Sequence, residues 1–243
     1  NVPSKIGSLI AVGTSICGAS AIVATSPAIN ANKEEVTYAI ANITIFGIVA
    51  MFIYPFLAHY LFNGDQLSVG LFLGTSIHET AQVAGAGLIY SEQYNSPTTM
   101  DIATVTKLVR NISMIVVIPF ISYLYLKNNI EKNNSNPSIF SMFPIFIIGF
   151  IIMGLIRSIG DLGIQNSDQA FGIFLNDKWQ LIINYIKSLA EYSLSIAMAA
   201  VGLSTNLVSL RNLGIRPFYV GLSAALSVGF ISYFGIIFLN YFI

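Results

Sequence analysis

The sequence LIAVGTSICGASAIVATSPAI, residues 9–29, is a mostly apolar run whose centre holds glycine, hydroxyl and thiol side chains. Its length matches the roughly 20 residues that a helix needs to cross a bilayer. Glycine weakens a helix, and the hydroxyls of Thr14, Ser15 and Ser20 offer other hydrogen bonds to the backbone. The stretch therefore predicts a membrane-spanning helix that is broken near its middle.

The composition of the whole chain also favours a membrane location. Apolar residues make up 55% of the 243 positions and charged residues only 9%, whereas a soluble domain carries about 25% charged residues. The 11 basic and 11 acidic residues balance, so no surface for nucleic acid is expected. The single cysteine, Cys17, excludes an intrachain disulfide and a multi-cysteine metal site. We expect no metal or cofactor.

Seven apolar stretches are long enough to cross the membrane as helices. They are residues 6–29, 36–62, 67–90, 104–126, 139–157, 180–207 and 216–243. They do not alternate as the strands of a membrane barrel would. We therefore expect an all-α, multi-pass protein with a single transmembrane domain over residues 1–243. The excess of Lys and Arg at one set of ends, such as Lys5 and Lys127, places that set in the cytoplasm and the C-terminus outside.

A second interrupted helix is predicted near the end of the 180–207 stretch. Residues 200–204, AVGLS, repeat the pattern AVGTS of residues 11–15, about five helix-and-loop units later. An odd number of units inverts the second copy, and interrupted helices in matching positions of inverted halves indicate a transporter's substrate site. The N-termini of half-helices suit an anion. The alternative is that these small residues only allow close helix packing.

His78 and Glu79 stand side by side in GTSIHETAQV, residues 74–83. Ionisable residues at membrane depth are costly and usually functional. Together with Gln82 they are candidates for coupling transport to a proton, because a histidine can carry one near neutral pH. Sodium coupling would instead use carbonyls and hydroxyls at the helix breaks, with Glu79 as a charged ligand. The alternative is that both residues bridge neighbouring helices and never titrate.

An enzymatic function is not expected from these motifs. HETAQ lacks the second histidine of the H-E-x-x-H zinc site, and neither a phosphate-binding glycine loop nor a nucleophile elbow is present. Two cations, Lys107 and Arg110, open the 104–126 stretch. Either they extend to the interface, as cations near helix ends do, or they face a cavity and attract an anion.

Together the motifs resemble the YeiH-like family of bacterial membrane proteins named as sulfate exporters. GTSICGASAI, GTSIHETAQV, VTKLVR and AMAAVGLSTNL occur in the family's order and cover nearly the whole chain. This sequence has Glu79 where family members often carry Asp, which keeps the carboxylate. It has Val109 where they often carry Thr, which removes a hydroxyl.

The resemblance implies two inverted five-helix repeats whose broken fourth helices cross at the centre. The seven stretches would be the last seven helices of that core, with about three more before Asn1. The implied substrate-binding residues at the two breaks are Thr14, Ser15, Cys17 and Ser20, and Gly202, Ser204, Thr205 and Asn206.

The expected function is a secondary transporter in the bacterial cell membrane. It would move a small anion, with sulfur-containing anions as candidates, by alternating access and would be driven by H⁺ or Na⁺. A homodimer is a candidate assembly. The alternative is a receptor or sensor subunit that binds a solute without moving it.

Overall fold

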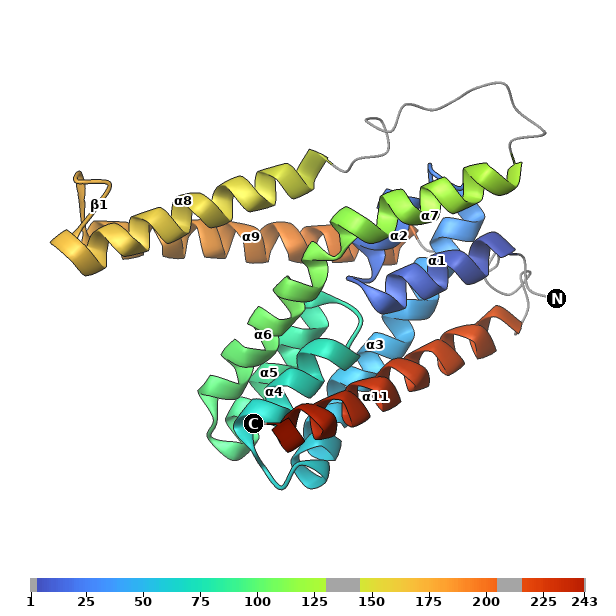
Figure 1. Cartoon of the computed structure of the whole chain (residues 1–243), viewed down its shortest axis with the longest axis horizontal. Helices are drawn as coiled ribbons and strands as arrows, with labels where there is room; N and C mark the ends of the chain where they lie inside the picture. The colour runs from blue at the N-terminus through green and yellow to red at the C-terminus, as the bar shows by residue number, and fades with distance from the viewer. Residues whose placement is uncertain (1–3, 130–144, 205–215, 243) are drawn as a thin grey trace. The chain divides into compact units, whose positions relative to one another are not determined.

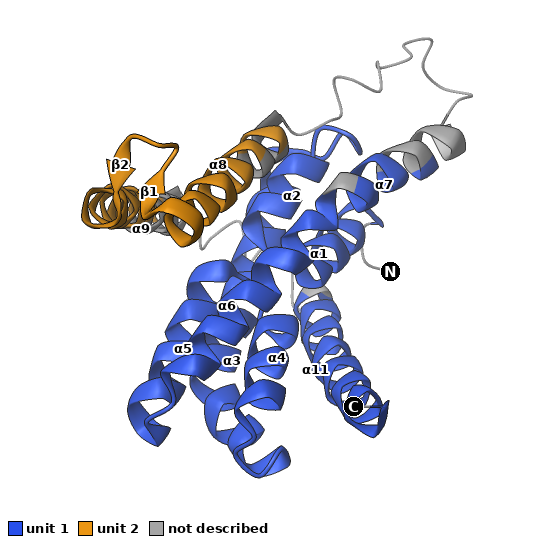
Figure 2. Cartoon of the chain, turned by 60° about the vertical axis from the view of Figure 1, so that its left-hand side comes forward, with its two compact units in different colours: residues 1–143, 205–243 blue, residues 144–204 orange. Residues whose placement is uncertain are grey.

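The computed structural model describes residues 4–129, 145–204 and 216–242, and nearly all of them are helical. This confirms the all-α expectation. The chain divides into two compact units, shown in different colours in Figure 2. Unit 1 consists of Asn1–Phe143 with Thr205–Ile243, and unit 2 consists of Pro144–Ser204.

The first apolar stretch is broken, as predicted (Figure 1). Helix α1 covers Ser4–Ser15 and helix α2 covers Ala19–Thr25. Between them, Gly18 has a φ of +78°, in the left-handed region that glycine adopts at no steric cost. The break that the glycine-containing sequence predicted is therefore present, and Gly18 is its local cause.

The third apolar stretch, residues 67–90, is also broken, which was not predicted from the sequence. Helix α4 covers Gln66–Ser76 and helix α5 covers Thr80–Tyr94. Ile77 and Glu79 between them have extended backbone dihedrals. No proline or glycine occupies this break, so its cause lies in contacts with other helices.

Unit 1 is completed by α3 (Lys33–Leu61), α6 (Pro97–Ile112), α7 (Met114–Asn129) and α11 (Arg216–Phe242). The Asn32 side chain accepts a hydrogen bond from the Glu35 N–H at 2.8 Å and starts α3 with a capping box. In the described part of the chain, three helical runs are long and apolar enough to cross a membrane: Lys33–Leu61, Pro97–Ile121 and Phe218–Phe242. The count of seven crossings and the inverted repeat stay predictions.

Helix α6 packs closely against both halves of the broken pair α4 and α5, and the three lie side by side in Figures 1 and 2. Glycines make this approach possible. A Cβ added to Gly70 would meet the Ile102 side chain at 2.6 Å, and one added to Gly87 would meet the Met100 backbone at 3.0 Å. Small residues allow helix backbones to approach in a membrane, and here they bring the cations of α6 to the break.

Unit 2 is a pair of helices joined by a two-stranded ribbon. Helix α8 covers Ile145–Ser167, strands β1 (Gln169–Ala170) and β2 (Phe174–Leu175) pair antiparallel, and helix α9 covers Asn176–Ser204. Both helices are longer than the predicted stretches 139–157 and 180–207 and extend into the loop expected between them. Residues 139–144 of the predicted stretch lie outside the described residues.

The second predicted interruption is not present at Gly202. Helix α9 continues through Gly202 to Ser204. A single glycine costs a helix only about 1 kcal/mol, and the alanines before it are the best helix formers, which explains why the helix continues. Thr205 and Asn206, the other half of this prediction, lie outside the described residues.

Candidate functional site

Lys107 of α6 joins the two helix breaks. Its side chain is fully buried, with 0% of its surface exposed. The ammonium Nζ donates to the carbonyl oxygens of Ile16 at 2.9 Å, Ile77 at 2.9 Å and His78 at 2.5 Å. Ile16 follows the end of α1, and the other two residues follow the end of α4. Because the last carbonyls of a helix lack partners within it, Lys107 satisfies groups that the two breaks expose.

Arg110, one turn further along α6, extends the same arrangement. Its Nη2 donates to the Thr14 carbonyl at 2.6 Å, and its Nη1 donates to the carbonyls of Ile77, at 3.3 Å, and Thr75. The C-terminal end of a helix carries partial negative charge, which a nearby cation stabilises. The two cations therefore cap the ends of both α1 and α4, and Lys107 does not extend to the membrane surface.

Glu79 lies in the second break and connects it to α3. The residue is 4% exposed, and its Oε1 accepts a hydrogen bond from the Thr44 hydroxyl at 3.1 Å. The Glu79 N–H donates to Gln82 Oε1 at 3.2 Å, and Gln82 Nε2 donates to the Thr44 carbonyl at 3.2 Å. Thr44, Glu79 and Gln82 thus form a closed ring of hydrogen bonds. Thr44 was not predicted from the sequence.

Two glycines provide the space for this ring. A Cβ added to Gly18 would overlap the Glu79 side chain, and one added to Gly47 of α3 would overlap the Gln82 amide. The Glu79 carboxyl therefore lies against the first break while its backbone forms part of the second. Both interruptions meet around this one side chain.

Several polar atoms around the breaks are buried and have no hydrogen-bond partner among the residues that the structure describes. They are Thr14 Oγ1, His78 Nδ1, Glu79 Oε2 and Arg110 Nε. Buried polar groups in native proteins are nearly always paired, and each exception needs an explanation. A small solute or a proton that binds between the breaks is one such explanation.

The structure brings together, around the two breaks, the predicted residues of unit 1 that are buried. Thr14, Cys17, His78, Glu79, Gln82 and the two cations surround the two breaks in unit 1. Ser15 and Ser20 are exposed, and the Ser15 hydroxyl bonds to the Val12 carbonyl at 3.2 Å. Gly202 and Ser204 belong to unit 2, and Thr205 and Asn206 lie outside the described residues.

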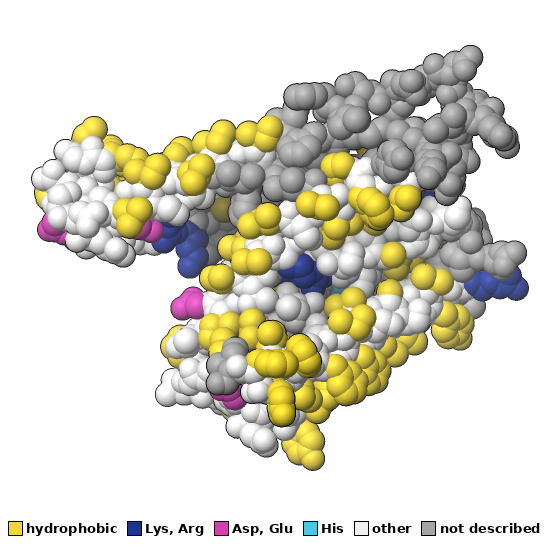
Figure 3. All heavy atoms as spheres, viewed as in Figure 1, with side chains coloured by type: hydrophobic (Ala, Val, Ile, Leu, Met, Phe, Trp, Pro, Cys, Tyr) yellow, Lys and Arg dark blue, Asp and Glu magenta, His cyan; other side chains and the backbone are white. Residues whose placement is uncertain are grey.

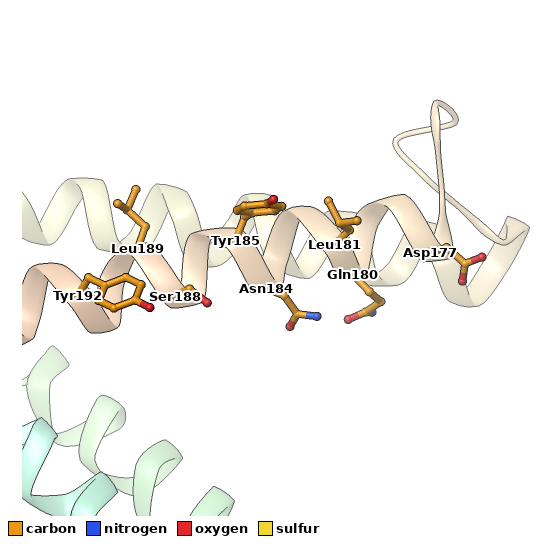
Figure 4. Close-up of a pocket in the computed structure, with 8 residues that line it drawn as sticks. All are labelled: Asp177, Gln180, Leu181, Asn184, Tyr185, Ser188, Leu189 and Tyr192. Carbon is orange, nitrogen blue, oxygen red and sulfur yellow. The ribbon is translucent and has the colours of Figure 1, made fainter.

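A separate hollow of about 620 Å³ lies along α9 in unit 2 (Figure 4). It is open to the surface, and none of the predicted site residues lines it. Leu181, Tyr185 and Leu189 project from one side of the helix, and Gln180 and Asn184 project from another. The other lining residues are Asp177, Ser188 and Tyr192. Because a single helix supplies all eight, the hollow is a helix surface and not an enclosed site.

Comparison with known proteins gives this chain a family. Residues 1–221 match the family model described as Conserved hypothetical protein 698. The chain is 32% identical over 235 residues to the UPF0324 membrane protein FN0533 of Fusobacterium nucleatum, covering 96% of this chain and 66% of that protein. It is 32% identical over 218 residues to the UPF0324 inner membrane protein YeiH of Escherichia coli, covering 88% and 55%.

The chain thus spans about half to two thirds of the length of these relatives. No solved structure matches it. The names of the relatives place proteins of this kind in a bacterial membrane, in agreement with the apolar helices of unit 1. The resemblance drawn from the motifs is confirmed: this chain belongs to the Conserved hypothetical protein 698 family of UPF0324 membrane proteins, which includes YeiH.

Proposed function

We propose that the chain forms part of a secondary transporter that moves a small anion across the bacterial cell membrane by alternating access. The observation that carries this proposal is the meeting of two interrupted helices around the buried Glu79 carboxyl. Lipid cannot satisfy a broken backbone, so non-helical segments at membrane depth occur where they are buried in protein or line a cavity. In transporters such breaks form the substrate and ion sites.

The charges around the breaks favour an anion as the solute. Lys107 and Arg110 supply two cations there, and Glu79 supplies one carboxylate. When Glu79 is ionised, the group carries one net positive charge in a region of low dielectric. A buried charge is costly unless it is paired, so a singly charged anion beside Arg110 Nε would balance the group while Glu79 is ionised. When Glu79 is protonated the group carries two net positive charges, which a doubly charged anion such as sulfate would balance. Sulfur-containing anions are among the candidates.

The coupling role falls to His78, Glu79 and Gln82. Hydrogen bonds with Thr44 of α3 and Gln82 of α5 position Glu79. Its side chain lies against Gly18 in the first break. A change in its charge would therefore alter contacts that hold two interrupted helices. That connection is what alternating access needs, because binding must favour one arrangement of the helices over another.

Transport into sealed vesicles tests the proposal. Glu79→Gln and His78→Ala should each lower the initial rate of gradient-driven uptake of labelled sulfate, thiosulfate or another small anion by about tenfold or more, the effect of roughly 1.4 kcal/mol on a rate. The matched control is Glu34→Gln, which changes an exposed carboxyl on α3 and should leave uptake unchanged. Uptake is normalised to the amount of folded protein in the vesicles.

The result can also contradict the proposal. If the loss of uptake only follows the loss of folded protein, Glu79 and His78 are structural residues. If anions bind but none is taken up under any imposed pH or sodium gradient, a receptor or sensor subunit becomes the better interpretation.

A further inference from the structure

We propose that the ammonium of Lys107 occupies a site built for a monovalent metal cation, so that this protein is coupled to protons and not to sodium. The contacts of Lys107 Nζ alone define the cation site. The choice of coupling ion rests on the proposed function.

The surroundings of Lys107 Nζ are those of a bound cation. Three main-chain carbonyl oxygens lie at 2.5–2.9 Å from it, one at the first break and two at the second. In transporters with broken helices, unwound carbonyls and the C-terminal ends of half-helices are the groups that coordinate sodium. Here main-chain carbonyl oxygens of the same kind surround the ammonium of Lys107, a side chain of α6, and not a metal ion.

The number of carbonyls shows that the side chain is charged. A protonated lysine has three N–H donors and no acceptor. A neutral amine has two N–H groups, and its lone pair would point at the third carbonyl oxygen. Three carbonyls around Nζ therefore require the ammonium form. With three carbonyl oxygens as acceptors, Lys107 acts as a cation tethered in the site.

The remaining oxygens leave little for a sodium ion. Arg110 binds the carbonyls of Thr14 and Thr75, so the exposed ends of both α1 and α4 are occupied. Among the described residues at the breaks, the side-chain oxygens left without a partner include Glu79 Oε2 and Thr14 Oγ1, and the Thr44 hydroxyl is already bonded to Glu79. A sodium ion needs several oxygen ligands, whereas a proton needs only one carboxylate oxygen. Glu79 Oε2 can take that proton.

The groups that would influence a proton on Glu79 come from every element around it. Lys107 and Arg110 belong to α6, His78 lies in the same break, and Cys17 lies in the first break. Helix α3 contributes the neutral hydroxyl of Thr44. Protonation of Glu79 would remove the one negative charge among these groups. The positive charge that a bound anion must balance would then rise, which links proton binding to anion binding.

Thermal unfolding of the purified protein in detergent tests the cation site. The unfolding midpoint is measured in NaCl and in N-methyl-D-glucamine chloride at equal concentration. The wild-type midpoint should be the same in both salts. Lys107→Ala should lower the midpoint in the glucamine salt, and sodium should restore at least half of that loss in a saturable way, because a ligand that binds the folded state stabilises it. Lys107→Arg and the exposed Lys33→Ala should show no response to sodium.

Each other outcome overturns the inference. A saturable rise of the wild-type midpoint with sodium would mean that the site is not taken by Lys107. A Lys107→Ala protein that is equally unstable, or unfolded, in every salt would mean that the carbonyls form no metal site. For the coupling ion, wild-type uptake driven by a sodium gradient alone would exclude the proton. Failure to transport any anion would contradict the proposed function while leaving the salt result intact.

Discussion

Gly18 determines the geometry of the site at the scale of a single residue. Its φ of +78° ends the regular path of the first apolar stretch. Its missing side chain also leaves the space that the Glu79 side chain fills. A turn and a close contact thus depend on the same residue, and only glycine meets both demands.

Replacing Gly18 with alanine should therefore lower the free energy of unfolding by about 1–3 kcal/mol, the cost of a strained backbone position, with a further loss from the overlap with Glu79. The control is Gly7→Ala in α1, where an added Cβ meets no atom of the described residues within 4 Å. That change should stabilise the helix slightly, by up to about 1 kcal/mol. Unfolding in denaturant measures both. Equal stability of the two variants would contradict this account of the break.

The sequence predicts some site residues and misses others for a clear reason. His78 and Glu79 were found because an ionisable pair in an apolar stretch is costly. Thr44 was missed because one threonine in an apolar helix is ordinary, and its importance arises from a contact with Glu79 on another element. The role of Lys107 was left open because its partners are main-chain carbonyls, which every residue possesses. Contacts of this kind have no signature in sequence.

At the scale of the element, the two breaks differ in how they arise. The break after α1 contains Gly18 and was predicted from local sequence. The break after α4 contains neither glycine nor proline, and cations from α6 bind its free carbonyls. Gly202 shows the converse case, since α9 continues through it. Helix-breaking residues therefore predict an interruption only where neighbouring groups also form hydrogen bonds with the backbone that the break exposes.

The ribbon end of unit 2 offers a test of local electrostatics outside the predicted membrane stretches. Trp179, the single tryptophan of the chain, donates its Nε1–H to Asp161 at 2.7 Å, and Arg157 lies 3.2 Å from the same carboxylate. The hydrogen bond from Trp179, followed by that from Arg157, lowers the pKa of Asp161 below its ordinary value.

A carboxyl whose pKa is lower in the folded protein stabilises the fold above its unfolded pKa of about 3.9, and that contribution is lost as the pH falls through the folded pKa. Tryptophan emission should therefore stay constant from neutral pH down to about 3.9 and change only below it. Asp161→Asn, which keeps an acceptor without a titrating group, should remove the transition. A transition in the wild type at or above the ordinary pKa of aspartate would contradict the lowered pKa.

At the scale of the whole molecule, many large apolar side chains are exposed on the described helices, and on the face in Figure 3 they gather in patches. Phe230, Phe234 and Phe238 are each more than half exposed along α11, and Phe52 and Ile53 are likewise exposed on α3. Contiguous apolar surfaces of this kind are rare on soluble monomers and indicate a membrane or a partner. Helices α3 and α11 both contain candidate membrane spans, so lipid is the surrounding that fits their exposed sides.

The orientation of α3 in the membrane can be predicted and measured. A helix of 29 residues is about 43 Å long at 1.5 Å per residue, which exceeds the roughly 30 Å hydrocarbon core. Its two ends should thus emerge on opposite sides. The distribution of Lys and Arg places the start of α3 outside the cell and the turn before α4 in the cytoplasm. Exposed positions are available at both ends, at Glu34 and at Gln66.

Labelling of single cysteines at these positions shows on which side of the membrane each end of α3 lies. In a Cys17→Ser background, Glu34→Cys should react with a membrane-impermeant maleimide added to intact cells. Gln66→Cys should react only after the cells are opened. The protein with Cys17 alone should stay nearly unlabelled, because that thiol is buried. Reversed labelling would invert the orientation but keep α3 as a crossing. Labelling of both positions from the same side would show that α3 does not cross, and an anion site between the two helix breaks would then lie outside the membrane.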